Sequence, residues 1–213
     1  MPTFGVIGSG EVGQVLAKGL KQHGYGVRIG SRTPAKLSEY ARETGIQPGT
    51  FAEVARWGDA LVLSVAGVAA ERVLVMVGTD ALRGKLVIDT TNPTTDDPPE
   101  QGVLKSFMAA NTSLMEQLQR SAPEARFVKA FNSVGSARMV DPDFGGVRPT
   151  MFYCGDDAEA KAAVARLLQQ FGWDPEDMGG AVAARAIEPL AVLWCIPGFL
   201  RDSWTHAFCL LRS

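Results

Sequence analysis

The sequence predicts an α/β fold in which a doubly wound, mostly parallel sheet carries a short helical appendage at its C-terminal end. Short apolar runs alternate with amphipathic stretches of about ten residues, which is the signature of right-handed β-α-β units. The first apolar run leads straight into a glycine-rich turn. Hydrophobic residues make up 46% of the 213 residues and charged residues 21%, as in ordinary globular proteins, so extensive disorder is excluded.

Each strand and helix of this alternation has its own pattern. Short apolar runs bounded by glycine or polar residues predict strands at 3–7, 25–30, 60–64, 85–89, 126–130, 151–154 and, as a candidate, 173–178. Apolar spacing and capping residues predict helices at 11–23, 50–57, 68–77, 113–121 and 156–171, and one opened by Thr33-Pro34. Asp156 and Glu159 are expected to form a capping box. From Gly180 onward the pattern is helical, with kinks expected at Pro189 and Pro197.

The turn after the first strand matches a phosphate-binding motif. The pattern G-x-G-x-x-G is formed by Gly8, Ser9, Gly10, Glu11, Val12 and Gly13. Its first glycine permits a tight turn, its second lets a pyrophosphate approach the backbone, and its third allows close packing of helix on strand. The helix that follows offers free N–H groups to phosphates. Because strand, turn and helix occur in this order, the motif is interpreted as a Rossmann-type dinucleotide site. The alternative is a glycine-rich turn that binds no ligand.

The end of the second strand favours NADP(H) over NAD(H). An NAD site has an acidic residue about twenty residues after the glycines. Here Ser31 and Arg32 stand at the strand end and Lys36 follows one helical turn later, with no carboxylate among them. A guanidinium can bind a 2′-phosphate through two hydrogen bonds, and its neighbours add a donor and a charge. The alternative is that these cations are solvated surface groups.

A proton donor for substrate chemistry is not evident. The chain has no Tyr-x-x-x-Lys motif, and Arg185 stands where a β-hydroxyacid dehydrogenase would have its lysine. Arginine stays protonated and is a poor general acid. Hydride transfer between two cofactors depends more on ring stacking than on an acid. Asn92, Asn132 and Ser133, in loops after strands, are candidates for holding a nicotinamide or an acceptor ring, or else are turn residues that bond their own backbone.

Charge, cysteine count and hydropathy limit which partners, metal sites and cellular compartments are expected. A net charge of −2 without a basic run disfavours nucleic acid and anionic membranes as partners. Three widely spaced cysteines exclude a disulfide framework and a cysteine zinc site, and they fit the cytoplasm. No metal site and no signal peptide are expected. The most apolar stretch, 186–200, contains Glu188, two prolines and Gly198, so it is expected to be too broken to span a bilayer.

Several segments resemble one known family, the coenzyme F-420-dependent NADP oxidoreductases, whose fold also forms the reductase domain of the Steap metalloreductases. The similar segments, which span nearly the whole chain, are GVIGSGEVG, IGSRTPAK, VKAFNSVG, MFYCGDD and ARAIEPL. The resemblance implies 2′-phosphate contacts by Ser9, Ser31, Arg32 and Lys36. It implies that Glu11 and Val12 lie along the pyrophosphate. It also implies a nicotinamide and acceptor pocket bordered by Val65, Ala66 and Val134.

The chain departs from that family on the acceptor side. Asn132 stands where archaeal members have histidine, and Pro189 and Ala191 replace hydroxyl residues near Arg185. Residues 1–179 are expected to form the dinucleotide-binding domain, and 180–213 a helical segment that closes the acceptor pocket. The many large apolar residues of this segment predict burial against the sheet or a homodimer interface.

The expected function is hydride transfer between NADP(H) and a small-molecule acceptor, either coenzyme F-420 or a flavin. Two alternatives remain open. The first is a small NADPH-dependent carbonyl or imine reductase, in which Arg185 or Asn132 polarises the substrate. The second is a non-catalytic sensor that binds NADP(H).

Overall fold

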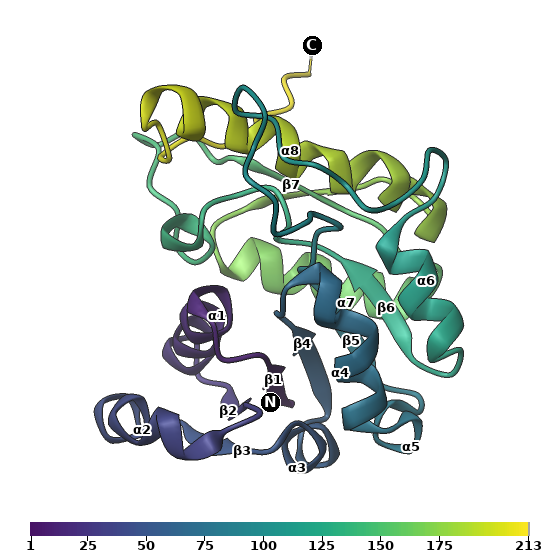
Figure 1. Ribbon diagram of the computed structural model, residues 1–213. Coiled ribbons are helices and arrows are strands. Elements are labelled where there is room, and N and C mark those ends of the chain that lie inside the picture. Colours follow the sequence, from purple (N-terminus) through teal and green to yellow (C-terminus); the bar gives the residue numbers. More distant parts are fainter. Residues whose placement is uncertain (213) are drawn as a thin grey trace.

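The computed structural model describes residues 1–212 and confirms the α/β fold (Figure 1). Six parallel strands form one sheet in the order β3-β2-β1-β4-β5-β6. These strands are β1 (Thr3–Ile7), β2 (Gly26–Gly30), β3 (Gln47–Gly49), β4 (Ala60–Leu63), β5 (Leu86–Asp89) and β6 (Arg126–Lys129). The strand order reverses between β1 and β4, which creates the crevice where open α/β sheets bind their ligands.

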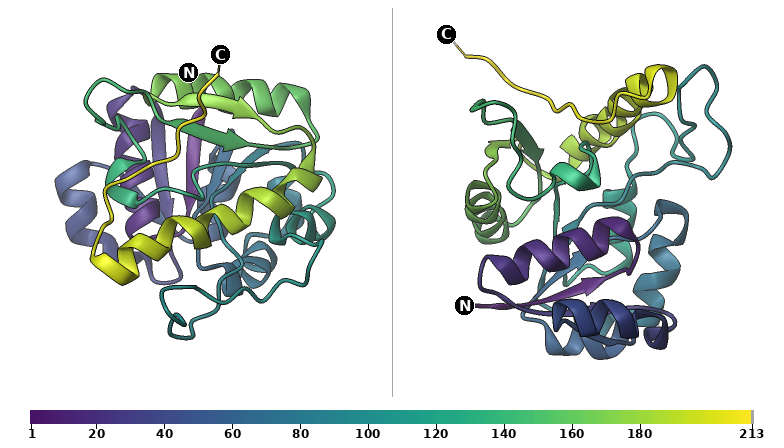
Figure 2. Two further views of the ribbon diagram at one scale, coloured as in Figure 1. Left: turned by 90° about the horizontal axis from the view of Figure 1, so that it is seen from above. Right: turned by 90° about the vertical axis from the view of Figure 1, so that its left-hand side faces the viewer.

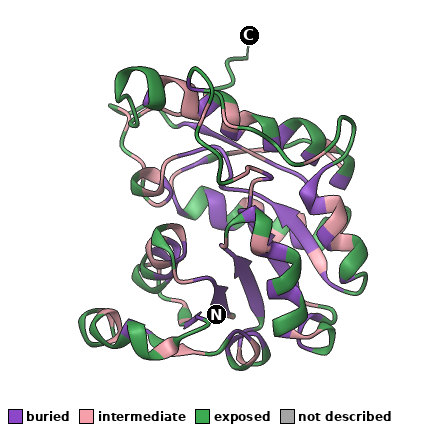
Figure 3. Cartoon of the chain, in the orientation of Figure 1, coloured by how far each residue is buried: buried purple, intermediate pink, exposed green. Residues whose placement is uncertain are grey.

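Helices cover both faces of this sheet, as Figure 3 shows by the buried strands and the exposed outer sides of the helices. One face carries α1 (Glu11–Gln22) and α7 (Ala158–Gln170). The other carries α3 (Phe51–Trp57), α4 (Ala70–Val77), α5 (Thr79–Leu82) and α6 (Leu114–Ser121). The short α2 (Ser38–Thr44) lies beside β3. Successive residues of a strand point to opposite faces, so Val6 joins the first core and Ile7 the second.

The strands β7 (Thr150–Tyr153) and β8 (Asp174–Asp177) exist as expected, but they do not extend the main sheet. They pair in parallel as a separate two-stranded sheet with α7 as their crossover. An antiparallel bridge between Lys129 and Cys154 links this small sheet to the end of β6. A second layer is thus attached at the carboxyl end of the main sheet.

The C-terminal segment differs from its expectation in two ways. Helix α8 (Ala184–Arg201) continues through Pro189 and Pro197 without interruption. The prolines therefore do not break the stretch as expected. By length and composition alone, residues 181–201 form a helix long and apolar enough to cross a membrane, and a third of its most apolar part is buried inside the protein. The segment 202–212 contains no helix, so the helical prediction for 180–213 fails there, and residue 213 lies outside the described residues. Figure 2 shows α8 from above along its full length.

Two local predictions also need correction. Helix α7 is capped by Asp157, whose Oδ1 accepts from the N–H of Ala160 at 2.7 Å. Asp156 instead accepts from the N–H of Ala181, so it does not form the expected capping box with Glu159. The strand β3 has no apolar run and was not predicted.

Candidate functional site

The glycine turn has the geometry that a phosphate site requires. Gly8 has φ of +130°, and a Cβ at this position would lie 2.1 Å from the carbonyl oxygen of Ser64. A Cβ on Gly13 would lie 2.2 Å from the carbonyl oxygen of Gly8, because α1 packs closely on β1. A Cβ on Gly10 would meet nothing within 4 Å, and no side chain caps α1 there. The first N–H groups of α1 are therefore open to an anion.

A first cavity of about 330 Å³ extends from this turn along the end of β2 to α4. Three cations line it, Arg32 and Lys36 from the segment after β2 and Arg72 from α4. No Asp or Glu lines it among residues 1–212. None of the three cations forms an ion pair within that part of the chain. The cavity therefore offers unneutralised positive charge to an anionic ligand.

Two serines prepare the same end of the cavity. Ser31 is buried, and its Oγ accepts from the backbone N–H of Thr33 at 3.1 Å. The Oγ of Ser9 donates to the Oγ of Ser31 at 3.2 Å. Since these contacts hold both hydroxyls beside Arg32, the residues expected at the 2′-phosphate lie together at one end of one cavity.

A second cavity, also of about 330 Å³, adjoins the first on the other side of the glycine turn. The two cavities share Gly10, Ser64, Val65 and Ala66. The second is completed by Glu11, Val12, Gly67, Thr90, Thr91, Asn92 and Thr94. Together the cavities form one path across the carboxyl ends of β1 and β4, with the glycine turn between its two parts, which is the arrangement of a dinucleotide site in an open α/β sheet.

Asn92 and Asn132 hold each other at the border of the second cavity. The Nδ2 of Asn92 donates to the backbone oxygen of Asn132 at 2.8 Å, and the Nδ2 of Asn132 donates to Oδ1 of Asn92 at 3.1 Å. Asn132 also donates to the backbone oxygen of Ile187 in α8 at 2.9 Å. Asn92 lines the second cavity and Asn132 stands behind it, so this pair fixes the wall rather than projecting into the space.

Three other candidates lie outside both cavities. Val134 is buried in the core on the α1 and α7 face. Ser133 is also buried. Arg185 binds Glu116 of α6 through two hydrogen bonds of 2.7 and 2.9 Å, and this contact holds the pKa of the Glu116 carboxyl below its usual value. The guanidinium of Arg185 is thus engaged by a carboxylate.

A buried ionic cluster stands behind the second cavity, and the sequence reasoning missed it. The Nζ of Lys129 lies 2.7 Å from Asp89 and 2.9 Å from Glu188, and all three side chains are buried. Lys129 also donates to the backbone oxygen of Thr91 at 2.8 Å. Burial disfavours the charged ammonium, but the two carboxylates outweigh it and raise the pKa of Lys129. The available signal was a lysine that directly follows the apolar pair Phe127-Val128 at the end of a predicted strand.

The same cluster binds the C-terminal segment to the sheet. The carboxylate of Glu188, on α8, accepts from the N–H groups of Leu114 and Met115 at the start of α6, each at 2.9 Å. A carboxylate at a helix N-terminus is stabilised by the free N–H groups and the helix dipole. The loop after β5, α6 and α8 therefore meet at one point behind the wall of the second cavity.

Proton donors are scarce around the second cavity. Glu11 is its one titratable lining side chain among residues 1–212, and its carboxylate accepts from the hydroxyl of Ser136. The hydroxyl of Thr90 donates to a backbone oxygen and that of Thr91 to Asp89. Within the described residues, the one carboxyl group that lines this cavity is therefore already held by a neighbouring hydroxyl.

Known proteins share this architecture. The family model described as "NADP oxidoreductase coenzyme F420-dependent" matches residues 3–93. A crystal structure of a putative F420-dependent NADP reductase from Arthrobacter sp. FB24 has a TM-score of 0.93 and 31% identity, covering 100% of both chains. Metalloreductase STEAP3 of Rattus norvegicus is 31% identical over 207 residues, which is 93% of this chain.

The matches differ in how much of each known protein they cover and in sequence identity. The chain spans about 40% of the length of the curated metalloreductases it matches, with 39% and 40% of two of them covered. An imine reductase from Pseudomonas sp. has a TM-score of 0.69 at 20% identity, covering 93% of this chain and 62% of that one, which shows a shared fold alone. The full-length match at 31% identity, together with a cation-lined cavity at the glycine turn, places the chain among NADP-dependent oxidoreductases: it belongs to the family of coenzyme F420-dependent NADP oxidoreductases.

Proposed function

We propose that this protein transfers a hydride between NADP(H) and a flavin-like acceptor, with the deazaflavin coenzyme F-420 as the leading candidate. One observation carries the proposal. A cavity that, within residues 1–212, is lined by three cations and no carboxylate opens across the glycine turn into a second cavity whose one acidic side chain, Glu11, is bonded to Ser136. The first cavity suits a phosphorylated adenosine, and the second cavity suits the nicotinamide ring stacked on the ring of the acceptor. The Arthrobacter protein described as a putative F420-dependent NADP reductase supports the choice of acceptor.

The residues of the chain supply binding and orientation. The N-terminus of α1 would hold the pyrophosphate, while Ser31, Arg32 and Lys36 would hold the 2′-phosphate. Val65 and Ala66 would bear on the nicotinamide, in the second cavity. Bound NADP(H) supplies or accepts the hydride when the acceptor ring stacks on it. The proton that accompanies reduction would come from solvent, because the one carboxylate that lines the second cavity within residues 1–212, Glu11, is already hydrogen-bonded to Ser136.

The acceptor can be identified by stopped-flow oxidation of protein-bound NADPH. Coenzyme F-420, FMN, a cyclic imine and a ketone would be mixed with the complex while nicotinamide absorbance is followed. Fast oxidation by the deazaflavin or the flavin is expected. Turnover of only the imine or ketone would replace the proposal with a small reductase, and tight NADPH binding without any turnover would replace it with a sensor.

The NADP(H) half can be tested by Arg32→Ala. A charge-assisted hydrogen-bonded contact is worth about 1.5–3 kcal/mol, so the Kd for NADPH should rise about 10- to 150-fold. The Kd for NADH should change little, because it lacks the 2′-phosphate. Arg42→Ala is a matched control, since this exposed arginine pairs with Glu39 and does not line the cavity. Equal losses for NADPH and NADH would contradict the assignment.

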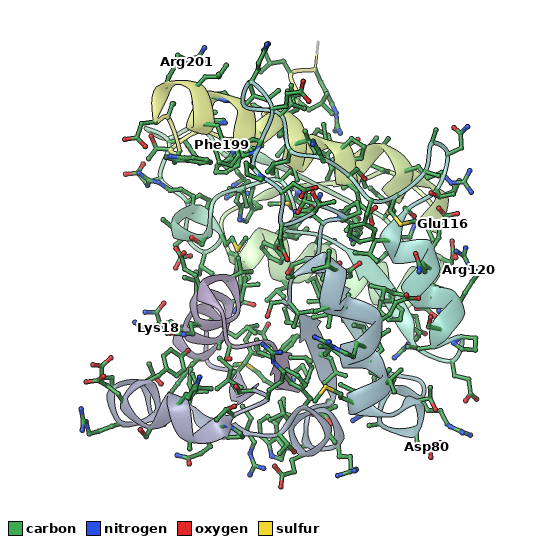
Figure 4. All side chains as sticks on the ribbon, viewed as in Figure 1. Lys18, Asp80, Glu116, Arg120, Phe199 and Arg201 are labelled. Atoms are coloured by element: carbon green, nitrogen blue, oxygen red, sulfur yellow. The ribbon has the colours of Figure 1, made fainter. Side chains whose placement is uncertain are left out.

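We also propose that the protein is a cytoplasmic homodimer. The unpaired state of Cys154, Cys195 and Cys209 supports a reducing compartment. The exposed apolar side chains of Leu193 and Phe199 on α8 support pairing with a second copy (Figure 4 labels Phe199).

A further inference from the structure

We propose that Arg72 and Met76 of α4 form the wall that binds the adenine ring of NADP(H), with the Arg72 guanidinium stacked on the purine. The inference rests on the proposed NADP(H) site. It assigns the cation that lines the first cavity from α4, whereas Arg32 and Lys36 line it from the segment after β2. It also predicts a role for Arg72 that does not depend on the 2′-phosphate.

Helix α4 presents one face to the first cavity. Arg72 and Met76 are four residues apart and therefore neighbours on that face, Val73 lies between them, and Ala69, just before the helix, also lines the cavity. The adjacent carboxylate points elsewhere, because Glu71 accepts from the hydroxyl of Ser121 on α6. Arg72 is thus the one charged group that α4 contributes to the cavity within the described residues.

The position of the base follows from the chemistry of the nucleotide. The 2′-phosphate and the adenine are attached to neighbouring carbons of the same ribose. If Ser31 and Arg32 hold the phosphate, the base has to lie in the same cavity, within one sugar's width. The strand end and the glycine turn are then occupied by the phosphates. Apart from the turn after β4 and Phe51, which is buried in the core, the lining that remains is the face of α4.

The side chains of that wall suit a flat aromatic ring. Met76 is 46% exposed although it is large and apolar, and a purine lying against it would cover it. Arginine is planar and weakly hydrated, so it stacks on aromatic faces. The 2′-phosphate already has donors at the end of β2, whereas no other cation of the cavity approaches from α4. The Arg72 guanidinium is therefore better suited to stack on the adenine than to bind the 2′-phosphate.

The experiment compares three ligands against Arg72→Ala by nicotinamide fluorescence. NADPH and NADH both carry adenine, and reduced nicotinamide mononucleotide lacks the adenosine half. A cation–π contact of this kind corresponds to roughly a 3- to 30-fold rise in Kd, and it should be the same for NADPH and NADH. Binding of the mononucleotide should be unchanged. Arg120→Ala, at the exposed position on α6 labelled in Figure 4, is the matched control.

The outcomes separate this inference from the proposed function. A loss confined to NADPH would make Arg72 a phosphate ligand and overturn the stacking role, as would no loss for either dinucleotide. Arg72→Lys adds a second test, because it keeps the charge but not the planar group and should bind both dinucleotides nearly as weakly as Arg72→Ala. If Arg32→Ala raises the Kd of NADPH much more than that of NADH in these cases, the NADP(H) site stands while the adenine wall fails.

Discussion

Replacing Lys129 with methionine should destabilise the protein strongly. The substitution keeps a side chain of similar length but leaves Asp89 and Glu188 as two buried carboxylates without their shared cation. Breaking a buried ion pair by removing one partner typically costs about 3–5 kcal/mol. For a chain of this size each kcal/mol lowers Tm by roughly 2–4 °C, so a fall of about 6–20 °C is expected. Tryptophan fluorescence follows the unfolding, since Trp173 and Trp194 are buried. A urea titration gives the lost free energy of unfolding, and a thermal melt gives the fall in Tm.

Two comparison variants show whether charge is the cause. Lys18→Met removes an exposed lysine of α1, labelled in Figure 4, and should change stability by less than about 0.5 kcal/mol. Adding Asp89→Asn and Glu188→Gln to Lys129→Met removes the unpaired charges and should restore much of the loss. If Lys129→Met costs under about 1 kcal/mol, or if the triple variant is no more stable than the single one, the electrostatic reasoning is refuted.

Three further predictions concern the glycine turn, the dependence of protein stability on acidic pH, and dimer formation. Gly10→Val should lower Tm by no more than about 5 °C, because its Cβ meets nothing within 4 Å and only the N-cap preference of α1 is lost. It should nevertheless raise the Kd of NADPH and NADH more than about tenfold by filling the pyrophosphate position, and a larger fall in Tm or an unchanged Kd would contradict this. The depressed pKa of Glu116 means that its bond to Arg185 stabilises the fold above the ordinary carboxyl pKa, and the contribution is lost as pH falls through the lowered value. The stability gap between wild type and Arg185→Ala should therefore close in acid, and a gap independent of pH would refute it. Leu193→Glu, on the exposed side of α8, should give a monomer in light scattering, and an unchanged dimer would exclude this face.

Five strands of the main sheet, β1, β2, β4, β5 and β6, could be predicted because each is marked locally, whereas their order in the sheet comes from the structure. Apolar runs such as those ending at Ile7 and Leu63 need only their own composition to be recognised, and the glycine turn fixes which strand comes first. The strand Gln47–Gly49 could not be predicted, because its three residues include proline and glycine and it pairs at the sheet edge with β2 alone.

Other features depend on contacts that sequence patterns do not carry. Helix α8 passes through Pro189 although an isolated helix would break there, since Glu188 beside it is fixed by α6 and Lys129. The same contacts explain why Lys129 was overlooked: its two carboxylate partners are distant in the chain. At the site, the cations after β2 were predicted from one segment, whereas Arg72 reaches the same cavity from another helix.

The carboxylate of Glu188 has a consequence for how such proteins diversify. It joins α8 to α6 and to the strand β6, so α8 is not an interchangeable cap. A chimera that takes α8 from a relative without a carboxylate at the position of Glu188 would leave the buried Lys129 without one of its two partners. New acceptor preferences are therefore easiest to reach by changing residues around this anchor, one at a time, while the anchor itself is inherited intact.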